Sequence, residues 1–205
     1  MKSSLILTVL LTAAFLCSSC KEDSTVYPPV LTEFVNLQTD HSGNIHMLLT
    51  DEGSTFTISH ATNDRKLVPD STYRVVALYE IQETQTPTAY LYDFTYAFSK
   101  MPLTIWKDEL KQDPVKIQSI WTKGDYLNLI LLIKAQNQPH VFHFIETDKH
   151  PIVRLQLYHD KGSDIEAYTQ RAYLSVPLQH YKSDNNEIQF TINTDQGIKT
   201  YSFPL

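Results

Sequence analysis

The chain is a succession of short apolar runs that are separated by clusters of turn-forming residues. In the run that begins at Tyr126, Leu127, Leu129, Leu131 and Ile133 occupy every second position. Successive side chains of a β-strand point to opposite faces, so these four are expected to share one buried face. Regularly spaced strands of this length are typical of barrels and sandwiches. Because no long stretch carries its apolar residues at helical spacing, we expect an all-β fold.

The runs fall into two groups on either side of residues 99–114, which contain two prolines and a predicted helical turn over 104–111. Gly, Asp, Asn and Pro between the runs favour turns. The first group predicts strands at 30–37, 44–50, 54–60, 72–82 and 89–98. The second predicts strands at 115–121, 126–135, 140–147, 152–159, 171–178, 187–194 and 198–204, with Ile188, Phe190 and Ile192 on one face. These counts indicate an N-terminal five-stranded OB-like barrel followed by a seven-stranded immunoglobulin-like β-sandwich.

The N-terminus has the features of a secretory signal. Lys2 is followed by the apolar stretch "LILTVLLTAAFL" and by the small residues Ser18 and Ser19. A membrane-spanning helix needs about 20 apolar residues, so this stretch is too short to cross a bilayer. The sequence "CSSC" then resembles a lipobox with Cys20 as the lipidated residue. The alternative is an ordinary cleaved signal with incidental cysteines.

Cys17 and Cys20 are the only cysteines, and a redox or zinc role for them is disfavoured. Redox CxxC motifs belong near a βαβ pattern, and a zinc site needs about four ligands. Lys21, Glu22 and Asp23 resemble a surface-export signal, and the alternative is a solvated tether. We therefore expect a protein anchored by lipid in the outer membrane, at the cell surface or on the periplasmic face.

The predicted organisation has five parts: a signal peptide (1–19), a lipidated tether (20–29), an OB-like domain (30–100), a linker (101–114) and a β-sandwich domain (115–205). Removing residues 1–19 removes one Lys and no acid, so the formal net charge moves from −6 to −7. A mildly acidic chain with scattered cations lacks the basic footprint of a nucleic-acid-binding protein, so no nucleic-acid partner is expected.

The stretch "AYLYDFTYAF" places an aromatic residue at every second position. In a regular strand, all five rings would point to one face. As a ligand platform, such a face could stack on sugars or offer a surface to a protein. The favoured interpretation is that the rings fill the barrel core or contact the second domain. The five residues are Tyr90, Tyr92, Phe94, Tyr96 and Phe98.

Four histidines invite a metal interpretation, which the spacing disfavours. His140 and His143 lie three residues apart, which places them on opposite faces of a strand. His150 and His159 would approach them only through the tertiary fold, so isolated histidines on the surface or in turns are expected and no metal site is predicted. The acidic stretch "YHDKGSD" lacks the spacing of an EF-hand, and a calcium-binding loop there is the less favoured alternative.

No catalytic residue or cofactor is predicted. The sequence has no G-x-S-x-G elbow, no H-E-x-x-H and no phosphate-binding Gly loop, whereas paired carboxylates from distant strands stay open as an alternative. In "WTKGDYLNL", Gly124 is expected to permit a tight hairpin with Trp121 and Leu127 packed below it. The alternative is that this turn presents exposed aromatics.

The chain resembles the NigD-like lipoproteins over roughly residues 27–205. The resemblance rests on "YPPVLTEFVNLQTDHSGNIHMLLTDEGSTFTI", "LVPDSTYRVVALYE", "DPVKIQSIWTKGDYLNLILLI", "LYHDKGSDIEAYTQRAYLSVPL" and "EIQFTINTDQGIKTYSFPL". It implies an N-terminal OB-like domain and a C-terminal β-sandwich, without any catalytic residues. The name of the family comes from a bacteriocin-associated gene cluster.

We therefore expect a non-enzymatic, membrane-anchored binding or accessory module whose partner is an envelope protein or a glycan. A cell-surface hydrolase that acts on peptide or glycan is the alternative from a different class. A bacteriocin-associated immunity or inhibitor protein is a further alternative, which rests on the family name. The sequence leaves the oligomeric state open.

Overall fold

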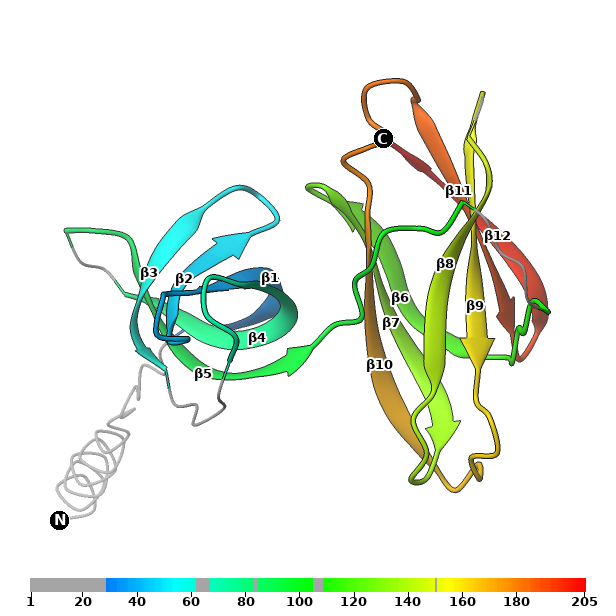
Figure 1. Cartoon of the computed structure of the whole chain (residues 1–205), viewed down its shortest axis with the longest axis horizontal. Coiled ribbons are helices and arrows are strands. Elements are labelled where there is room, and N and C mark those ends of the chain that lie inside the picture. Colours follow the sequence, from blue (N-terminus) through cyan, green and yellow to red (C-terminus); the bar gives the residue numbers. More distant parts are fainter. Residues whose placement is uncertain (1–28, 62–66, 83–84, 105–108, 150) are drawn as a thin grey trace, which may run out of the picture.

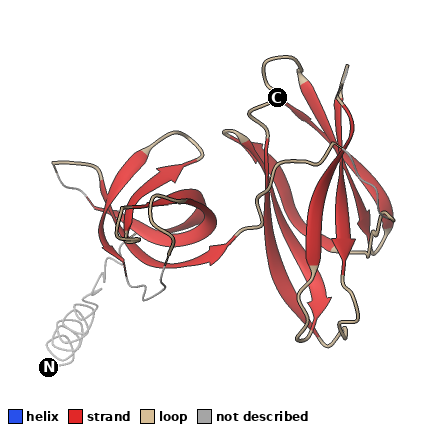
Figure 2. Cartoon of the chain, in the orientation of Figure 1, coloured by secondary structure: helices blue, strands red, loops and turns tan. Residues whose placement is uncertain are grey.

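The computed structural model describes residues 29–61, 67–82, 85–104, 109–149 and 151–205. Within these ranges the chain forms twelve strands and no helix, so the predicted all-β fold is confirmed (Figures 1 and 2). In this part of the chain, no helix has the length and apolar character needed to cross a membrane. Cys20 and the Lys21, Glu22 and Asp23 segment lie outside the described residues.

The first five strands form a closed barrel with the order β1-β2-β3-β5-β4. It closes because β1 pairs antiparallel with both β2 and β4, while β3 pairs parallel with β5. Its core holds buried side chains such as Leu37, Leu48, Val75, Tyr79 and Phe94. The strands are β1 (Val30–Thr39), β2 (Ile45–Thr50), β3 (Thr55–Ala61), β4 (Thr72–Gln82) and β5 (Thr88–Tyr96).

The remaining seven strands form two packed sheets. One sheet has the order β10-β7-β6, and the other has the order β12-β11-β9-β8 with a parallel pair between β9 and β11. The predicted barrel of five strands and sandwich of seven strands are therefore both present. The strands are β6 (Lys116–Lys123), β7 (Tyr126–Ala135), β8 (Val141–Asp148), β9 (Val153–Asp160), β10 (Tyr168–Pro177), β11 (Glu187–Thr194) and β12 (Gly197–Pro204).

The sandwich core is built from the alternating faces that the sequence indicates. Leu127, Leu129 and Leu131 are fully buried, and Ile133 is nearly so. From the other sheet, the three predicted positions of β11 are likewise buried. Removing such a side chain from water stabilises the fold by about 1.5–3 kcal/mol, which is why a strict alternation fixes strand register.

Between the barrel and β6, residues 97–104 and 109–115 run along the sandwich. Phe98 forms a bridge with Leu174 of β10, and Leu103 forms one with Ile145 of β8. Further bridges join Gln112 to His159 and Val115 to Thr194. The helical turn predicted for 104–111 is absent from residues 104 and 109–111, and its centre, 105–108, lies outside the described residues.

The barrel stands beside the outer face of the β10-β7-β6 sheet, as Figure 1 shows. The second sheet, β12-β11-β9-β8, lies on the far side of the sandwich from the barrel. The outer face of the first sheet is therefore the part of the sandwich that meets the barrel.

Candidate functional site

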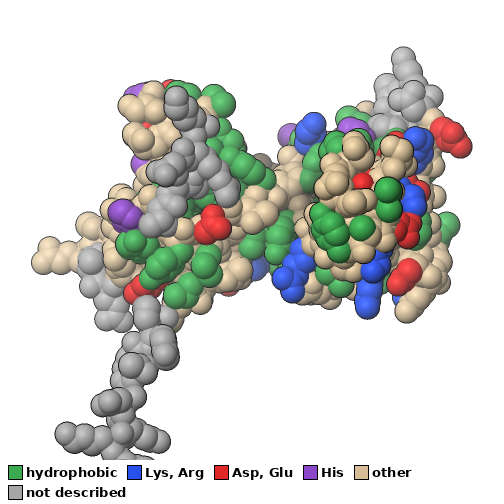
Figure 3. Space-filling view, turned by 90° about the horizontal axis from the view of Figure 1, so that it is seen from below, with side chains coloured by type: hydrophobic (Ala, Val, Ile, Leu, Met, Phe, Trp, Pro, Cys, Tyr) green, Lys and Arg blue, Asp and Glu red, His purple; other side chains and the backbone are tan. Residues whose placement is uncertain are grey.

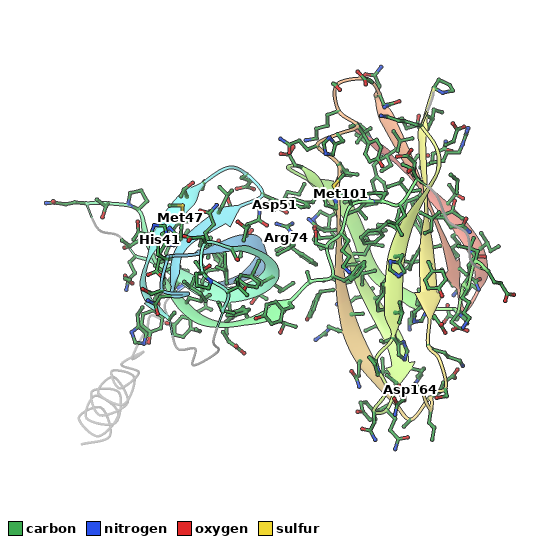
Figure 4. The ribbon with its side chains drawn as sticks, in the orientation of Figure 1. His41, Met47, Asp51, Arg74, Met101 and Asp164 are labelled. Carbon is green, nitrogen blue, oxygen red and sulfur yellow. The ribbon has the colours of Figure 1, made fainter. Side chains whose placement is uncertain are left out.

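A buried arginine joins the barrel to the sandwich. Arg74 of β4 makes a bidentate pair with Asp51 of the β2–β3 turn, with Nη1 to Oδ1 at 2.5 Å and Nη2 to Oδ2 at 2.7 Å. The two side chains are only 5% and 1% exposed. Figure 4 shows both on the side of the barrel that faces the sandwich. A buried pair of this kind stabilises a fold only when its remaining hydrogen-bonding groups are also satisfied.

The sandwich supplies those partners. Arg74 Nε donates to Ser175 Oγ at 2.9 Å, and Nη2 donates to Asn128 Oδ1 at 3.0 Å. Asn128 Nδ2 in turn donates to Asp51 Oδ2 at 3.0 Å, and Ser175 Oγ donates to Asn128 Oδ1 at 2.7 Å. Four residues from two domains therefore satisfy one another out of contact with water, which holds the domains in one relative orientation.

Tyr126 and Gly124 complete this junction. The guanidinium carbon of Arg74 lies 3.8 Å from the centre of the Tyr126 ring, within the range of a cation–π contact. The Tyr126 hydroxyl also accepts a hydrogen bond from Asn36 Nδ2 of β1 at 3.2 Å. Gly124 has a φ of +55°, and a Cβ there would lie 2.1 Å from the carbonyl oxygen of Asp51. The β6–β7 turn therefore fits against the barrel only with glycine at this position.

The predicted tight hairpin in "WTKGDYLNL" is present, because Lys123 pairs directly with Tyr126. Its two large apolar residues do not pack together, however. Leu127 is buried in the sandwich core, whereas Trp121 lies on the opposite face of the sheet, in the row of Asn128. The barrel covers this face, which the sequence does not indicate.

A cleft of about 280 Å³ lies beside the buried arginine, between β1 and β4 of the barrel and the outer face of the β10-β7-β6 sheet. Phe34 of β1 lines the cleft and makes edge-on contacts with Trp121 at 5.6 Å and Tyr173 at 6.0 Å between ring centres. Ile130 and Val76 add further apolar surface. Concave, aromatic-lined surfaces at domain interfaces are common ligand sites.

The acids at the cleft are neutralised by their own partners. Glu33 Oε1 accepts a hydrogen bond from the buried Tyr79 hydroxyl at 3.0 Å, and burial followed by the charge of Glu33 raises the pKa of Tyr79. Lys123 Nζ lies 3.1 Å from Glu52 and 3.4 Å from Glu33, and the hydrogen bond with Glu52 is the largest cause of its raised pKa. Asp51 is occupied by Arg74.

The prediction that the five alternating aromatic residues of 90–98 share one face is wrong; four of them lie in β5, and Phe98 follows it. The pairing of β4 with β5 slips between Leu78, which faces Asp93, and Tyr79, which faces Leu91. Tyr92 is the extra residue of this β-bulge, and a bulge reverses the alternation that follows it. Phe94 consequently points into the barrel core, whereas Tyr90 and Tyr92 before it lie outside.

The five rings therefore occupy four environments, of which the barrel core, filled by Phe94, is one. Tyr90 stacks on His60 at 4.8 Å and contacts Tyr92 at 4.7 Å on the outside of the barrel. The Tyr92 hydroxyl donates to Glu80 Oε2 at 2.8 Å, which raises the pKa of Tyr92. Tyr96 is 48% exposed at the end of the barrel, while Phe98 packs against the sandwich core. A single platform of five rings does not exist.

Two of the histidines predicted to be isolated are in contact and buried. His140 Nδ1 lies 2.8 Å from His159 Nε2, and His159 Nδ1 lies 2.8 Å from the carbonyl oxygen of Asp113. A carbonyl can only accept, so His159 carries its proton on Nδ1 and accepts a hydrogen bond from His140. His140 Nε2 lies 3.4 Å from Asp164 Oδ2. Sequence spacing could not reveal this pair, because β8 and β9 bring it together.

Asp164 closes the lower end of the sandwich, where Figure 4 places it. Its carboxylate accepts hydrogen bonds from the backbone N–H groups of residues 136, 137 and 138, which hold its pKa well below the usual range. A second cavity of about 390 Å³ adjoins this cluster, and the charged and histidine side chains of its lining are His140, His159, Lys116, Lys134, Lys161, Glu166 and Asp195. Within the described ranges, no group of three or more His, Cys, Asp or Glu side chains has the arrangement of a metal site.

The other two histidines considered for a metal site, His143 and His150, do not belong to the pair of His140 and His159. His143 contacts the rings of Phe98 and Tyr158, and burial lowers its pKa. His150 lies outside the described residues.

In "YHDKGSD", Asp160 accepts hydrogen bonds from Lys111 Nζ and from the backbone N–H of Gly162. The acids of this loop are thus bound to groups of the protein itself.

Sequence reasoning missed the four residues of the buried junction. The sequence features that could have indicated these residues are present but weak. Arg74 is the only Lys or Arg among the described residues of the barrel. Asn128 and Ser175 are polar positions inside the apolar runs "LNLILL" and "YLSVP". What the sequence does not supply is the contact between domains that brings them together.

The comparisons with known proteins agree with this architecture. The family model of the NigD-like C-terminal beta sandwich domain matches residues 99–205, just over half of the chain. A NigD-like immunity protein from Bacteroides caccae is 33% identical, with a TM-score of 0.71 over 86% of this chain and 93% of its own. Among curated proteins, no match to the chain is found.

Two more distant structures share the fold alone. A candidate toxin-related protein from Parabacteroides distasonis has a TM-score of 0.68 at 14% identity, covering 86% of this chain and 93% of its own. A candidate lipoprotein from Bacteroides fragilis has a TM-score of 0.57 at 12% identity, covering 86% and 97%. The family match and the 33% identical structure together establish that the chain belongs to the NigD-like proteins.

Proposed function

We propose that this chain is a non-enzymatic binding protein of the cell envelope, and that it binds its ligand in the cleft between the barrel and the sandwich. The observation that carries the proposal is the preformed cleft itself, with Trp121 and Tyr173 presented beside Phe34. The buried junction around Arg74 fixes both walls before any ligand arrives. Rigid sites bind more tightly because less conformational entropy is lost on association.

The polar groups of the cleft favour binding over hydrolysis. A glycosidase needs two carboxyl groups that are available to act as acid, base or nucleophile. Asp51 lines the cleft, but three N–H groups of Arg74 and Asn128 occupy its carboxylate. Glu33 is held by Tyr79 and Lys123. These two acids are therefore structural.

Membrane anchoring through Cys20 is the second part of the proposal, with Lys21, Glu22 and Asp23 directing the protein to the cell surface. The lipobox-like "CSSC" supports the anchor. A candidate lipoprotein from Bacteroides fragilis that shares the fold is consistent with it. Two acyl chains give stable anchoring, whereas one alone is marginal.

The site can be tested by filling it. Gln118 lines the cleft, and its Oε1 accepts a hydrogen bond from Arg171 Nε at 3.0 Å. Gln189 of β11 is a matched control, because its Oε1 accepts from Arg154 Nε at 3.3 Å in the other sheet. The chain from residue 21 to 205, which contains every described element, would be used to capture ligands from envelope extract and a glycan array.

If Gln118→Trp abolishes capture and Gln189→Trp preserves it, the result would support ligand binding in the cleft. Equal capture by both variants would place the binding site elsewhere, and no capture by the unmodified chain would contradict a stable binding role. Circular dichroism would establish that both variants are folded before they are compared.

An immunity role is a second candidate, favoured by the 33% identical NigD-like immunity protein from Bacteroides caccae. Its partner would be a toxin rather than a nutrient or structural glycan. A strain without the gene should then become sensitive to bacteriocin-producing neighbours, and the gene in trans should restore growth. Unchanged sensitivity across a panel of producing strains would contradict this role.

A further inference from the structure

The sheet that forms one wall of the cleft is strongly biased in charge. Strands β6, β7 and β10 contain four Lys or Arg residues and no Asp or Glu. The described part of the barrel is the opposite, because Arg74 is its only Lys or Arg among seven Asp and Glu residues. A chain with a net charge of −6 thus carries a cationic sheet beside an acidic barrel.

All four cations lie on the outer face of that sheet. Lys116 and Arg171 both pair with Leu132, which places the three in one row across the strands. Lys134 lies two residues further along β7 on the same face, and Lys123 pairs with Tyr126 at the other end. Figure 3, seen from below, shows Lys and Arg side chains on the side of the sandwich that faces the barrel.

Three of these cations form no salt bridge within the described residues. Lys123 is paired with Glu33 and Glu52 at the cleft. Arg171, Lys116 and Lys134, in contrast, make no ion pair with another residue of the described ranges. Arg171 donates to the neutral Gln118. The cleft acids are therefore paired within the protein. In the second cavity Glu166 is paired with Lys161, so the row keeps cations that are free to bind a ligand.

The cations also connect two cavities. Arg171 and Gln118 line the cleft, while Lys116 and Lys134 line the second cavity of about 390 Å³. From Asn128 to Lys134, β7 advances six residues, or about 20 Å along the sheet. The aromatic rings stand at the barrel end of this track, and the unpaired cations follow away from the barrel.

We propose that this track binds an anionic oligosaccharide, with one sugar ring held against Trp121 and Tyr173 and its acid groups bound by Arg171, Lys116 and Lys134. This inference rests on the proposed function, because it assigns a ligand class to the same cleft. The cleft volume of about 280 Å³ suits a compact ring rather than a protein surface. Arginine binds carboxylate and sulfate in a bidentate manner, and Gln118 adds a group that can hydrogen bond to hydroxyls.

A panel of ligands can separate a requirement for negative charge from a requirement for sugar rings. Oligogalacturonate hexamers carry one carboxylate per ring, and their methyl esters have the same rings without charge. Chondroitin sulfate, alginate and heparin hexasaccharides extend the panel, and poly-glutamate supplies charge without sugar. Binding to residues 21–205 would be followed through Trp121 fluorescence in a Trp106→Phe variant, because Trp106 and Trp121 are the only tryptophans.

We expect at least one acidic oligosaccharide to bind, at least tenfold more tightly than its neutral counterpart, and to weaken as salt is raised because salt screens exposed charges. Arg171→Gln and Lys134→Gln should each weaken binding about fivefold or more. Lys199→Gln, on β12 of the other sheet, is the matched control and should leave the affinity unchanged.

Three results would overturn the inference. Equal affinity for acid and ester would remove the charge requirement, and competition by poly-glutamate at equal affinity would make the ligand an acidic peptide. No binding of any acidic sugar in the panel would exclude the ligand class. In each case the proposal that the cleft is the binding site is still supported if Gln118→Trp abolishes capture from envelope extract. That proposal is contradicted only if the variant has no effect on capture.

Discussion

Gly124 of the β6–β7 turn rests against Asp51 of the β2–β3 turn so closely that a Cβ on Gly124 would lie 2.1 Å from the Asp51 carbonyl oxygen. The backbone of one domain thus abuts the residue that binds Arg74 in the other. This contact couples a turn of the sandwich to the buried charge of the junction.

Gly124→Ala should therefore destabilise the junction more than left-handed strain alone. Gly162 is a matched control, because its φ of +59° resembles the +55° of Gly124, while a Cβ on Gly162 would meet nothing within 4 Å. Strain alone should cost about 1–2 kcal/mol. The added overlap should cost about 1–3 kcal/mol more in Gly124→Ala. Urea denaturation of both variants measures the difference, and equal losses would contradict a tight fit.

Arg74→Met should be among the most destabilising single changes in the chain. It leaves the Asp51 carboxylate buried without its cation, which typically costs about 3–5 kcal/mol. Adding Asp51→Asn should recover part of the loss, because the uncompensated charge is then removed. A double-mutant cycle from denaturant unfolding gives the coupling, and additive losses would show that the two side chains do not stabilise each other in the folded state.

The split of the aromatic run predicts unequal costs along β5. Phe94→Ala removes a ring from the barrel core and should cost about 3–5 kcal/mol. Tyr90→Ala removes a half-buried ring from the outer surface and should cost much less, because little apolar area returns to water. Thermal unfolding of the two variants provides the comparison. Similar losses would indicate that the bulge at Tyr92 is absent and that the rings share one face.

Stability should fall as pH is lowered through the range in which His159 titrates. Burial is the main cause of the lowered pKa of His159, with the backbone carbonyl of Asp113 opposing it. Between the ordinary histidine value of about 6.5 and the lowered pKa, the folded protein then binds fewer protons than the unfolded chain, so stability rises with pH in that range and falls as the pH is lowered through it. NMR titration, with His159→Gln for assignment, measures the pKa. A value above 6.5 would reverse the predicted sign.

Cys20→Ala should release the protein from the membrane into the soluble fraction, because lipidation is the proposed anchor. Deleting Lys21 to Asp23 should leave it anchored but hide it from external protease. Fractionation and protease shaving of whole cells provide the two measurements. Membrane association that persists in Cys20→Ala would contradict anchoring through that residue.

The sequence predicts those parts of the fold that depend on local alternation. The strands predicted at 126–135 and 187–194 coincide with β7 (Tyr126–Ala135) and β11 (Glu187–Thr194), since their inward positions are apolar without interruption. The bulge at Tyr92 is not predicted, because an inserted residue leaves the aromatic spacing unchanged and is visible only against β4.

The candidate site is less accessible to sequence reasoning than the fold. Arg74 and Ser175 are separated by 101 positions, and Arg74 and Asn128 by 54. No local pattern indicates that such distant residues meet. The cations of the outer face are visible in the sequence, but their common face follows only from the pairing of β6, β7 and β10.

The bridges that Phe98 and Leu103 make to the sandwich affect how its strand edges are exposed. Exposed strand edges are templates for aggregation, and a lipid-anchored protein would be concentrated with its copies on a surface. The barrel is closed, Phe98 adds to β10, and Leu103 adds to β8, so the segment after the barrel caps one edge of each sheet. The opposite edges, β6 and β12, contact each other. The chain thereby protects its own edges from pairing with neighbouring copies.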